Sequence, residues 1–124
     1  MNKKILVIDD SKMTRSYHAS ILKSAGYEVL EAEDGAKALD VLYREGNIDL
    51  ILTDLNMPNL DGYTMIKKIR EDENYKDLPI IIVTTLDKST NKMKGFEVGA
   101  NFYIVKPSDP ESLIESVKIA LGED

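Results

Sequence analysis

Residues 5–10 have the sequence ILVIDD, four apolar residues followed directly by two aspartates. A continuous apolar run is typical of a strand in a parallel sheet that helices cover on both faces. Three later runs, at residues 50–52, 80–83 and 102–105, have the same character. Residues 28–32 mix polar and apolar side chains, which is typical of an edge strand. The sequence therefore predicts five strands.

The segments between these strands carry apolar residues at helical spacing. Gly26, Gly46 and Gly99 follow three of the segments, as expected where helices end. The last segment begins with residues 108–110, Ser-Asp-Pro, which offer capping side chains and a proline suited to a first turn. The apolar residues that mark the five helices are Tyr17, Ile21, Leu22 and Ala25; Ala38, Leu39, Leu42 and Tyr43; Tyr63, Ile66 and Ile69; Met93 and Phe96; and Leu113, Val117, Ala120 and Leu121.

Strand and helix patterns alternate five times along the chain. Such alternation implies right-handed crossovers and an open, doubly wound parallel sheet. We expect an α/β fold with five helices and the flavodoxin-like strand order 2-1-3-4-5. In that order a ligand crevice opens at the carboxyl ends of the first and third strands. The side chains that follow those strands are therefore the first candidates for a functional site.

The composition indicates one ordinary globular domain over residues 1–124, with 43% hydrophobic and 31% charged residues. A formal net charge of -6 argues against direct nucleic-acid binding, because phosphate backbones attract clustered lysine and arginine. The chain has no cysteine, which excludes disulfides and thiolate metal sites and leaves oxygen ligands for a metal. The apolar run at residues 5–8 is too short for a signal peptide or a membrane span. We therefore expect a cytoplasmic protein without membrane insertion.

Polar side chains follow four of the predicted strands. They are Asp9 and Asp10 after the first strand, Asp54 after the third, Thr84 and Thr85 after the fourth, and Lys106 and Pro107 after the fifth. Because parallel strands end at one edge of the sheet, these residues are expected around the same crevice. Each of them alone is typical of a helix cap or a turn, but those roles do not explain their joint occurrence.

These polar residues are typical of phosphoryl transfer. Three carboxylates within about 5 Å would repel by about 3 kcal/mol per pair at an effective dielectric constant of about 20. Protonation would relieve this, but Mg²⁺ fits better, because it is held by few carboxylates together with a phosphate, whereas Ca²⁺ needs more ligands. Lys106 is expected on the side of Asp54 away from Asp9 and Asp10, where its ammonium can hold an incoming anion. With Thr84 as a hydroxyl donor, Asp54 can act as the nucleophile.

Five blocks of sequence extend this interpretation. They are VIDDS at residues 7–11, EAEDG at 31–35, DLNMPNLDG at 54–62, VT at 83–84 and YIVKP at 103–107. With these blocks, and over essentially its whole length, the chain resembles the receiver domains of two-component systems, especially stand-alone regulators of the CheY type.

The resemblance implies a phosphoacceptor site. Asp54 would accept a phosphoryl group from a histidine kinase. Asp10, Asp54 and the backbone carbonyl of Asn56 would bind Mg²⁺, and Asp9 would assist through a metal-bound water. Lys106 would pair with a phosphoryl oxygen.

The resemblance also implies a conformational switch. Thr84 would move to donate a hydrogen bond to the phosphoryl group, and Tyr103 would follow by rotating inward. The face formed by the fourth helix, the fifth strand and the fifth helix would change, so that an output protein docks differently. The chain would act as a monomeric switch with at most slow self-dephosphorylation, rather than as an enzyme.

Several loops have expected structural roles. Residues 34–35 and 61–62, both Asp-Gly, are expected to begin helices rather than to take part in the site. Residues 57–58, Met-Pro, are expected to shape the loop after Asp54. The bond between Lys106 and Pro107 resembles the family's cis peptide bond.

Two positions depart from the family pattern. Thr85 stands where the family usually has a small residue, and its β-branched side chain is expected to narrow access to Asp54 and slow phosphorylation or dephosphorylation. Ser108 replaces an aromatic residue that often follows the Lys-Pro pair, so we expect recognition of a different partner there. The single histidine, His18, follows a core-facing Tyr17 and is not expected to relay phosphate.

Other functions remain open to the same fold. A phosphorelay intermediate would pass the phosphoryl group onward. A phosphohydrolase of the haloacid dehalogenase type would need an acid two residues after Asp54, where the chain has Asn56. A flavin or nucleotide module would need a loop rich in glycine, serine or threonine after the first strand, where the chain has Asp9 and Asp10. An adaptor with a vestigial site is disfavoured, because every expected site residue is present.

Overall fold

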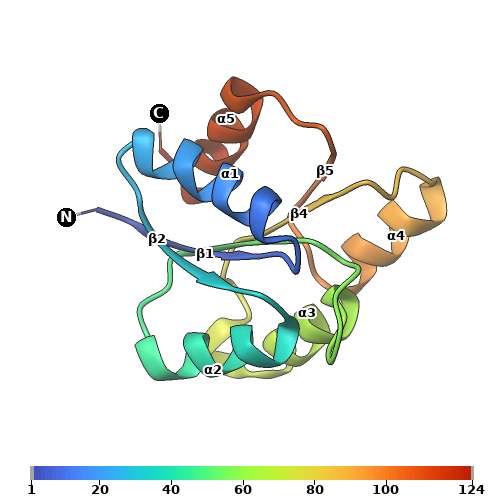
Figure 1. The fold of residues 1–124 in the computed structure, drawn as a ribbon. Coiled ribbons are helices and arrows are strands. Elements are labelled where there is room, and N and C mark those ends of the chain that lie inside the picture. The colour runs from blue at the N-terminus through green and yellow to red at the C-terminus, as the bar shows by residue number, and fades with distance from the viewer. Residues whose placement is uncertain (1, 124) are drawn as a thin grey trace.

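The fold is a five-stranded parallel sheet with helices on both faces (Figure 1). The computed structural model describes residues 2–123; Met1 and Asp124, the two ends of the predicted domain, lie outside the described residues. The strands are β1 (Lys4–Ile8), β2 (Glu28–Ala32), β3 (Leu50–Thr53), β4 (Ile80–Thr84) and β5 (Phe102–Val105). The helices are α1 (Lys12–Ser24), α2 (Gly35–Glu45), α3 (Gly62–Glu71), α4 (Ser89–Val98) and α5 (Pro110–Leu121), with a short 3-10 helix, η1 (Glu73–Tyr75).

The strand order is β2-β1-β3-β4-β5, which confirms the predicted flavodoxin-like topology. Each predicted strand agrees with the observed one to within one residue at either end. Among residues 2–123, no helix is long and apolar enough to cross a membrane.

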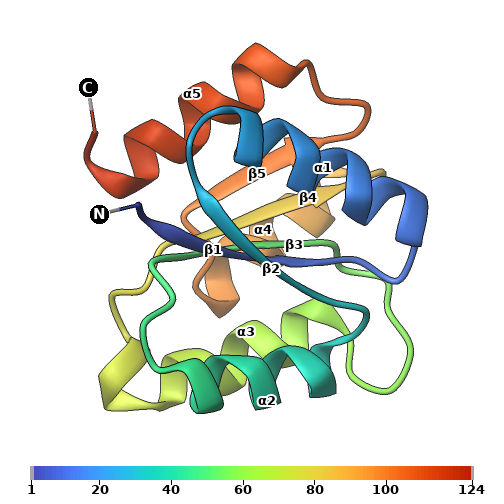
Figure 2. The ribbon, with the colours of Figure 1, turned by 60° about the vertical axis from the view of Figure 1, so that its left-hand side comes forward.

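Both faces of the central strands are apolar. Ile5 and Val7 of β1 belong to the core cluster under α1 and α5, whereas Leu6 and Ile8 belong to the cluster under α2 and α3. Figure 2 shows these two helical layers above and below the sheet. Burial on both faces explains why the strands are continuous apolar runs rather than alternating ones.

Helix α1 buries a different residue from the one that the sequence predicts. Tyr17 is 48% exposed, while the neighbouring His18 is only 3% exposed, so the prediction of a core-facing Tyr17 is wrong. Successive residues of a helix point about 100° apart, so a face assigned from spacing alone can be shifted by one position.

Helix α4 packs on the sheet through a glycine. A Cβ atom at Gly95 would lie 2.9 Å from Ile82 Cδ1 and 3.2 Å from Cδ2 of the Tyr103 ring. Met93 and Phe96, the apolar residues that mark this helix in the sequence, are both exposed. A glycine inside a helix lowers its stability by about 1 kcal/mol relative to alanine, so α4 is a weak helix.

Capping side chains begin four of the helices. Ser11, Asp34, Asp61 and Asp109 each accept a hydrogen bond from the backbone amide three residues later. The two Asp-Gly turns therefore begin helices, as predicted. These caps tie the loops after β1, β2, β3 and β5 to the helices that follow, which limits the positions available to the side chains on those loops.

Gly62 provides a test of this packing. An alanine Cβ there would lie 2.5 Å from the carbonyl oxygen of Asp54 and 2.9 Å from Leu55 Cα, so the backbone after β3 would have to move. We expect Gly62→Ala to lower the free energy of unfolding, measured by urea denaturation, by about 2 kcal/mol.

Gly46→Ala is the matched control for this substitution. Gly46 has φ +72°, and no atom lies within 4 Å of an added Cβ, so only its backbone conformation is unfavourable for alanine. That should cost about 1 kcal/mol. Wild-type stability in Gly62→Ala would contradict the close packing after β3.

Candidate functional site

Three carboxylates meet at the carboxyl edge of the sheet. Asp9 and Asp10 follow β1, and Asp54 follows β3, the direct neighbour of β1. The Asp54 amide donates to the carbonyl of Ile8 at 3.0 Å, which aligns the ends of the two strands. Each aspartate offers a carboxylate oxygen, and these oxygens lie within 4.8 Å of one another. The structure thus brings together the three carboxylates that the sequence places at the strand ends.

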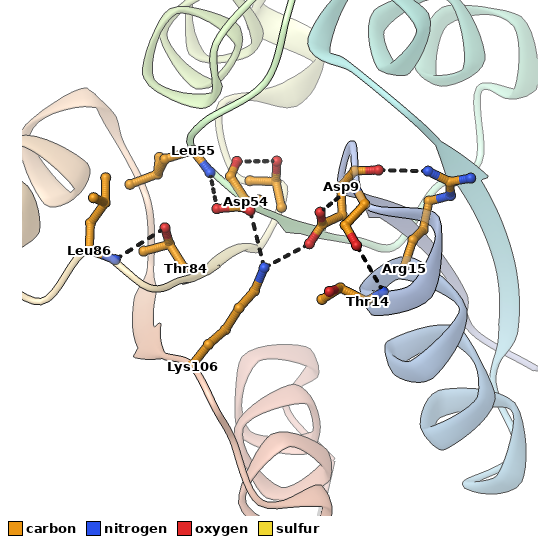
Figure 3. A network of polar contacts seen from close by, with 10 residues as sticks. Asp9, Thr14, Arg15, Asp54, Leu55, Thr84, Leu86 and Lys106 are labelled. Carbon is orange, nitrogen blue, oxygen red and sulfur yellow. Dashed lines mark hydrogen bonds and ion pairs between the residues drawn. The ribbon is translucent and has the colours of Figure 1, made fainter.

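Lys106 neutralises part of this negative charge. Its ammonium donates to Asp9 Oδ2 at 2.8 Å and to Asp54 Oδ2 at 3.1 Å (Figure 3). The expectation that Lys106 lies on the side of Asp54 away from Asp9 is wrong, because one ammonium bridges both carboxylates. Its flexible four-carbon stem lets the charge settle between two anions rather than beside one. The peptide bond from Lys106 to Pro107 is cis, as the resemblance implies.

The surroundings keep Lys106 protonated. Burial lowers the pKa of Lys106, but the hydrogen bond to Asp9 and the charge of Asp54 outweigh burial, so the pKa lies above its ordinary value. The site therefore holds a permanent cation at neutral pH. Such a cation can accept an arriving anionic group as a partner in place of a carboxylate.

Asp9 is held on several sides. It is 2% exposed, and its Oδ1 accepts a hydrogen bond from the Ser11 amide at 2.9 Å. Its backbone carbonyl accepts from Arg15 Nη1 at 2.7 Å, and Arg15 Nε is paired with Glu31 at 3.1 Å. No pattern in the sequence points to Arg15, because it reaches the site through the backbone carbonyl of Asp9. With Lys106 on Oδ2, both carboxylate oxygens of Asp9 are engaged.

Asp54 leads into the loop before α3. Its side chain is 13% exposed, and its Oδ1 accepts from the Leu55 amide at 2.7 Å. Asn56 is exposed on this loop, two residues after Asp54. The Gly62 amide donates to the Leu55 carbonyl at 2.9 Å and closes the loop onto the start of α3.

Thr84 and Tyr103 are joined through the backbone of Leu86. Thr84 is fully buried at the end of β4, and its Oγ1 accepts from the Leu86 amide at 3.4 Å. The Tyr103 hydroxyl donates to the Leu86 carbonyl at 2.6 Å. Burial, with smaller contributions from nearby charged and tyrosine groups, raises the pKa of Tyr103 to about 12, so its hydroxyl remains a donor at neutral pH.

The carboxylate cluster could hold a divalent metal ion. Its donors are all oxygens, which suits a hard cation such as Mg²⁺. Two oxygens on opposite sides of one Mg²⁺ lie about 4 Å apart, because each bond is about 2.1 Å long. Oxygens at adjacent positions of the octahedron lie about 3 Å apart, so the three carboxylate oxygens, which lie within 4.8 Å of one another, have to move closer together to bind one ion. Three carboxylates and one ammonium leave a net charge of -2, which a divalent cation balances.

A groove of about 490 Å³ adjoins Lys106 between α1 and the loops after β4 and β5. It is lined by Met13, Thr14, Tyr17, His18, Thr85, Lys106, Pro107 and Ser108. The Ser108 hydroxyl is buried and has no hydrogen-bond partner among residues 2–123. Thr85 is exposed beside this groove, and its effect on access to Asp54 stays a prediction.

Comparison with known proteins gives matches over nearly the whole chain. The family model of the response regulator receiver domain matches residues 5–118. The chain is 39% identical over 120 residues to chemotaxis protein CheY1 of Helicobacter pylori, covering 96% of this chain and 97% of that protein. It is also 39% identical to the chemotaxis protein CheY homolog of Campylobacter jejuni, covering 96% and 92%. The structure of chemotaxis protein CheY4 of Vibrio cholerae superimposes with a TM-score of 0.91 at 36% identity, covering 98% of this chain and 100% of that one.

Because the cluster is negatively charged, we expect Asp10→Asn to have opposite effects on stability without and with Mg²⁺. Asp10→Asn removes a repulsion of about 1 kcal/mol at an exposed position, so it should raise the free energy of unfolding in metal-free buffer. It should also abolish most of the stabilisation that Mg²⁺ gives the wild type. Asp40→Asn, at an exposed position on α2, makes the same charge change and should keep the Mg²⁺ response. Urea denaturation in both buffers tests this, and an unchanged Mg²⁺ response in Asp10→Asn would rule out a metal ligand there.

Because His18 is buried, we expect the protein to lose stability in mild acid. Burial lowers the pKa of His18 below its ordinary value of 6.5, the charge of Lys106 lowers it further, and Asp9 and Asp54 oppose both. The unfolded chain therefore binds the proton more tightly, so stability should fall as the pH drops below 6.5. The free energy of unfolding of the wild type, minus that of His18→Gln, should become smaller as the pH falls from about 7.5 to about 5. A difference that is constant over this range would contradict a buried neutral imidazole.

Proposed function

Because the chain belongs to the family of response regulator receiver domains, we propose that it is a signalling switch driven by phosphorylation of Asp54. The donor is the phosphohistidine of a histidine kinase, and Mg²⁺ is required. The observation that carries this proposal is the pairing of Asp54 with the Lys106 ammonium, inside a carboxylate cluster that suits a metal. The product is an aspartyl phosphate rather than a released molecule, so the chain acts as an acceptor and not as an enzyme with turnover.

In the proposed transfer, a carboxylate oxygen of Asp54 attacks the phosphorus. The new bond joins that oxygen to phosphorus as the phosphorus–nitrogen bond of the donor breaks, and the bonding electron pair stays on the imidazole nitrogen. Lys106 pairs with an oxygen of the transferred group, which it can do by giving up its bond to Asp54 or Asp9. Mg²⁺, when bound, neutralises charge on the transferred oxygens.

Asp10, Asp54 and the backbone carbonyl of Asn56 are the proposed Mg²⁺ ligands. Asp10 is exposed and can turn toward the ion. Asp9 differs, because the Ser11 amide and Lys106 already occupy its two carboxylate oxygens. That supports a role for Asp9 through a metal-bound water rather than through direct coordination.

The switch runs through the backbone of Leu86. The Thr84 hydroxyl oxygen accepts from the Leu86 amide, so its hydrogen can be donated to a phosphoryl oxygen. Any resulting shift of Leu86 moves the carbonyl that binds the Tyr103 hydroxyl. Tyr103 lies on β5 against Gly95 of α4, so the change reaches the surface formed by α4, β5 and α5.

We propose that this surface docks an output protein, as in a chemotaxis-type regulator. Met93, Phe96 and Ile119 are its large exposed apolar residues. The similarity to chemotaxis proteins over nearly the whole of both chains supports docking over onward relay of the phosphoryl group.

Incubation with acetyl phosphate and Mg²⁺, followed by intact mass measurement, tests the proposal. The wild type should gain the mass of one phosphoryl group, and Asp54→Ala should gain none. Asp40→Ala, which removes an exposed aspartate of α2, should be labelled like the wild type. An unlabelled wild type, or equal labelling of Asp54→Ala, would refute Asp54 as the acceptor.

A further inference from the structure

The loop between β3 and α3 passes beside the start of α2 (Figure 2). It begins directly after Asp54, contains Asn56 and ends at the cap of α3. Within it, Asn59 has φ +67°, in the left-handed region that side chains rarely adopt. The loop therefore contains a turn with an uncommon backbone conformation, which contacts with the rest of the fold have to stabilise.

Two hydrogen bonds tie this loop to α2. Asn59 Nδ2 donates to Asp34 Oδ2 at 2.8 Å, and the Gly35 amide donates to the Leu60 carbonyl at 3.2 Å. The packing is close, since a Cβ atom at Gly35 would lie 2.5 Å from that same carbonyl oxygen. Asp34 is only 2% exposed, whereas Asn59 is exposed, so the bond joins a buried acceptor to a donor at the surface.

Capping of α2 does not require Asn59. Asp34 Oδ1 accepts from the Lys37 amide at 2.8 Å, and this bond alone caps the helix. The second carboxylate oxygen of Asp34, Oδ2, instead accepts the hydrogen bond from Asn59 of the loop. The hydrogen bonds from Lys37 and Asn59 hold the pKa of Asp34 below its ordinary value, so the charged carboxylate is the acceptor.

The backbone does not require an asparagine at position 59 either. Glycine adopts positive φ more readily than asparagine does, so backbone geometry alone would favour glycine. The asparagine side chain is explained by its bond to Asp34. Since neither the cap of α2 nor the backbone at position 59 needs this bond, we assign it the role of fixing the position of the loop.

We infer that Asp34 and Asn59 are positioning residues for the metal site, because their bond holds the loop that carries Asn56 in place beside Asp54. This inference rests on the function proposed above, in which the Asn56 backbone carbonyl binds Mg²⁺. A backbone ligand is oriented by the contacts of its loop and not by its own side chain. Gly62 secures one end of the loop, and the Asp34–Asn59 bond secures its middle.

Asn59→Gly tests the inference, because glycine tolerates the positive φ of Asn59 and cannot make the side-chain bond to Asp34. Loss of an outer partner of a metal site commonly weakens metal binding about tenfold or more. We expect the Mg²⁺ dissociation constant of Asn59→Gly, measured by isothermal titration without a phosphoryl donor, to rise about tenfold. Far-UV circular dichroism should show native helix content.

Asn47→Gly is the matched control. Asn47 accepts a hydrogen bond from Lys4 Nζ at 3.2 Å and precedes β3, at the opposite edge of the sheet from the aspartates. The same change of residue there should leave Mg²⁺ affinity at the wild-type value. Equal weakening in both glycine variants would overturn the inference, because the effect would then be general.

Exchanging the two side chains gives a second test. Asn59→Asp places two carboxylates against each other and should weaken Mg²⁺ binding at least as much as Asn59→Gly. The double variant Asp34→Asn with Asn59→Asp restores one amide donor and one carboxylate acceptor, and it has the net charge of the wild type. It should recover affinity to within about threefold of the wild type, since the donor and acceptor are only reversed.

These measurements separate the inference from the proposed function. Unchanged Mg²⁺ affinity in Asn59→Gly and Asn59→Asp, with a wild type that binds Mg²⁺ and is labelled on Asp54, would overturn the inference alone. A wild type that neither binds Mg²⁺ nor accepts a phosphoryl group would overturn both.

Discussion

Lys106 donates one hydrogen bond to Asp9 and another to Asp54, and these bonds join the chain after β5 to the ends of β1 and β3. Three aspartates this close repel one another, so the cluster needs positive charge, and one ammonium does not supply enough. The remaining charge imbalance accounts for both parts of the proposed function. A divalent cation would balance this charge, and the protonated lysine could exchange its bonds to carboxylates for bonds to a phosphoryl group.

The sequence predicted what depends on local pattern and on strand topology. The continuous apolar runs gave the strands, because burial on both faces leaves no polar alternation, and the strand order placed Asp9, Asp10 and Asp54 at one edge. It could not predict that Lys106 bridges two carboxylates, because a long flexible side chain has many possible positions. Arg15 was missed because it binds a backbone carbonyl. The buried face of α1 was misplaced by one residue, at Tyr17 and His18, because helical spacing defines a face only approximately.

The proposed route from the site to the surface also runs through backbone groups. Leu86 joins Thr84 to Tyr103 by its amide and its carbonyl, so the identity of its side chain matters little to the link. The helix at the end of this route is weak: α4 has no side-chain cap at Lys88 and contains Gly95 under the Tyr103 ring. A weakly held element beside a rigid sheet is where a small change at the site can shift a population. The Asp34–Asn59 bond has a different role, because it restrains the loop between β3 and α3 that follows Asp54.

We propose that Asp54, Lys106 and the aspartates after β1 form one site for a metal ion and a phosphoryl group. A crystal structure with Mg²⁺ and beryllium trifluoride, a stable mimic of a phosphoryl group, tests it most directly. We expect the beryllium on an Asp54 carboxylate oxygen, the metal against Asp10 and Asp54, and the Lys106 ammonium moved from its present carboxylate partners to a fluoride. A mimic bound elsewhere, or an unmoved Lys106 with no metal beside Asp10, would contradict the account.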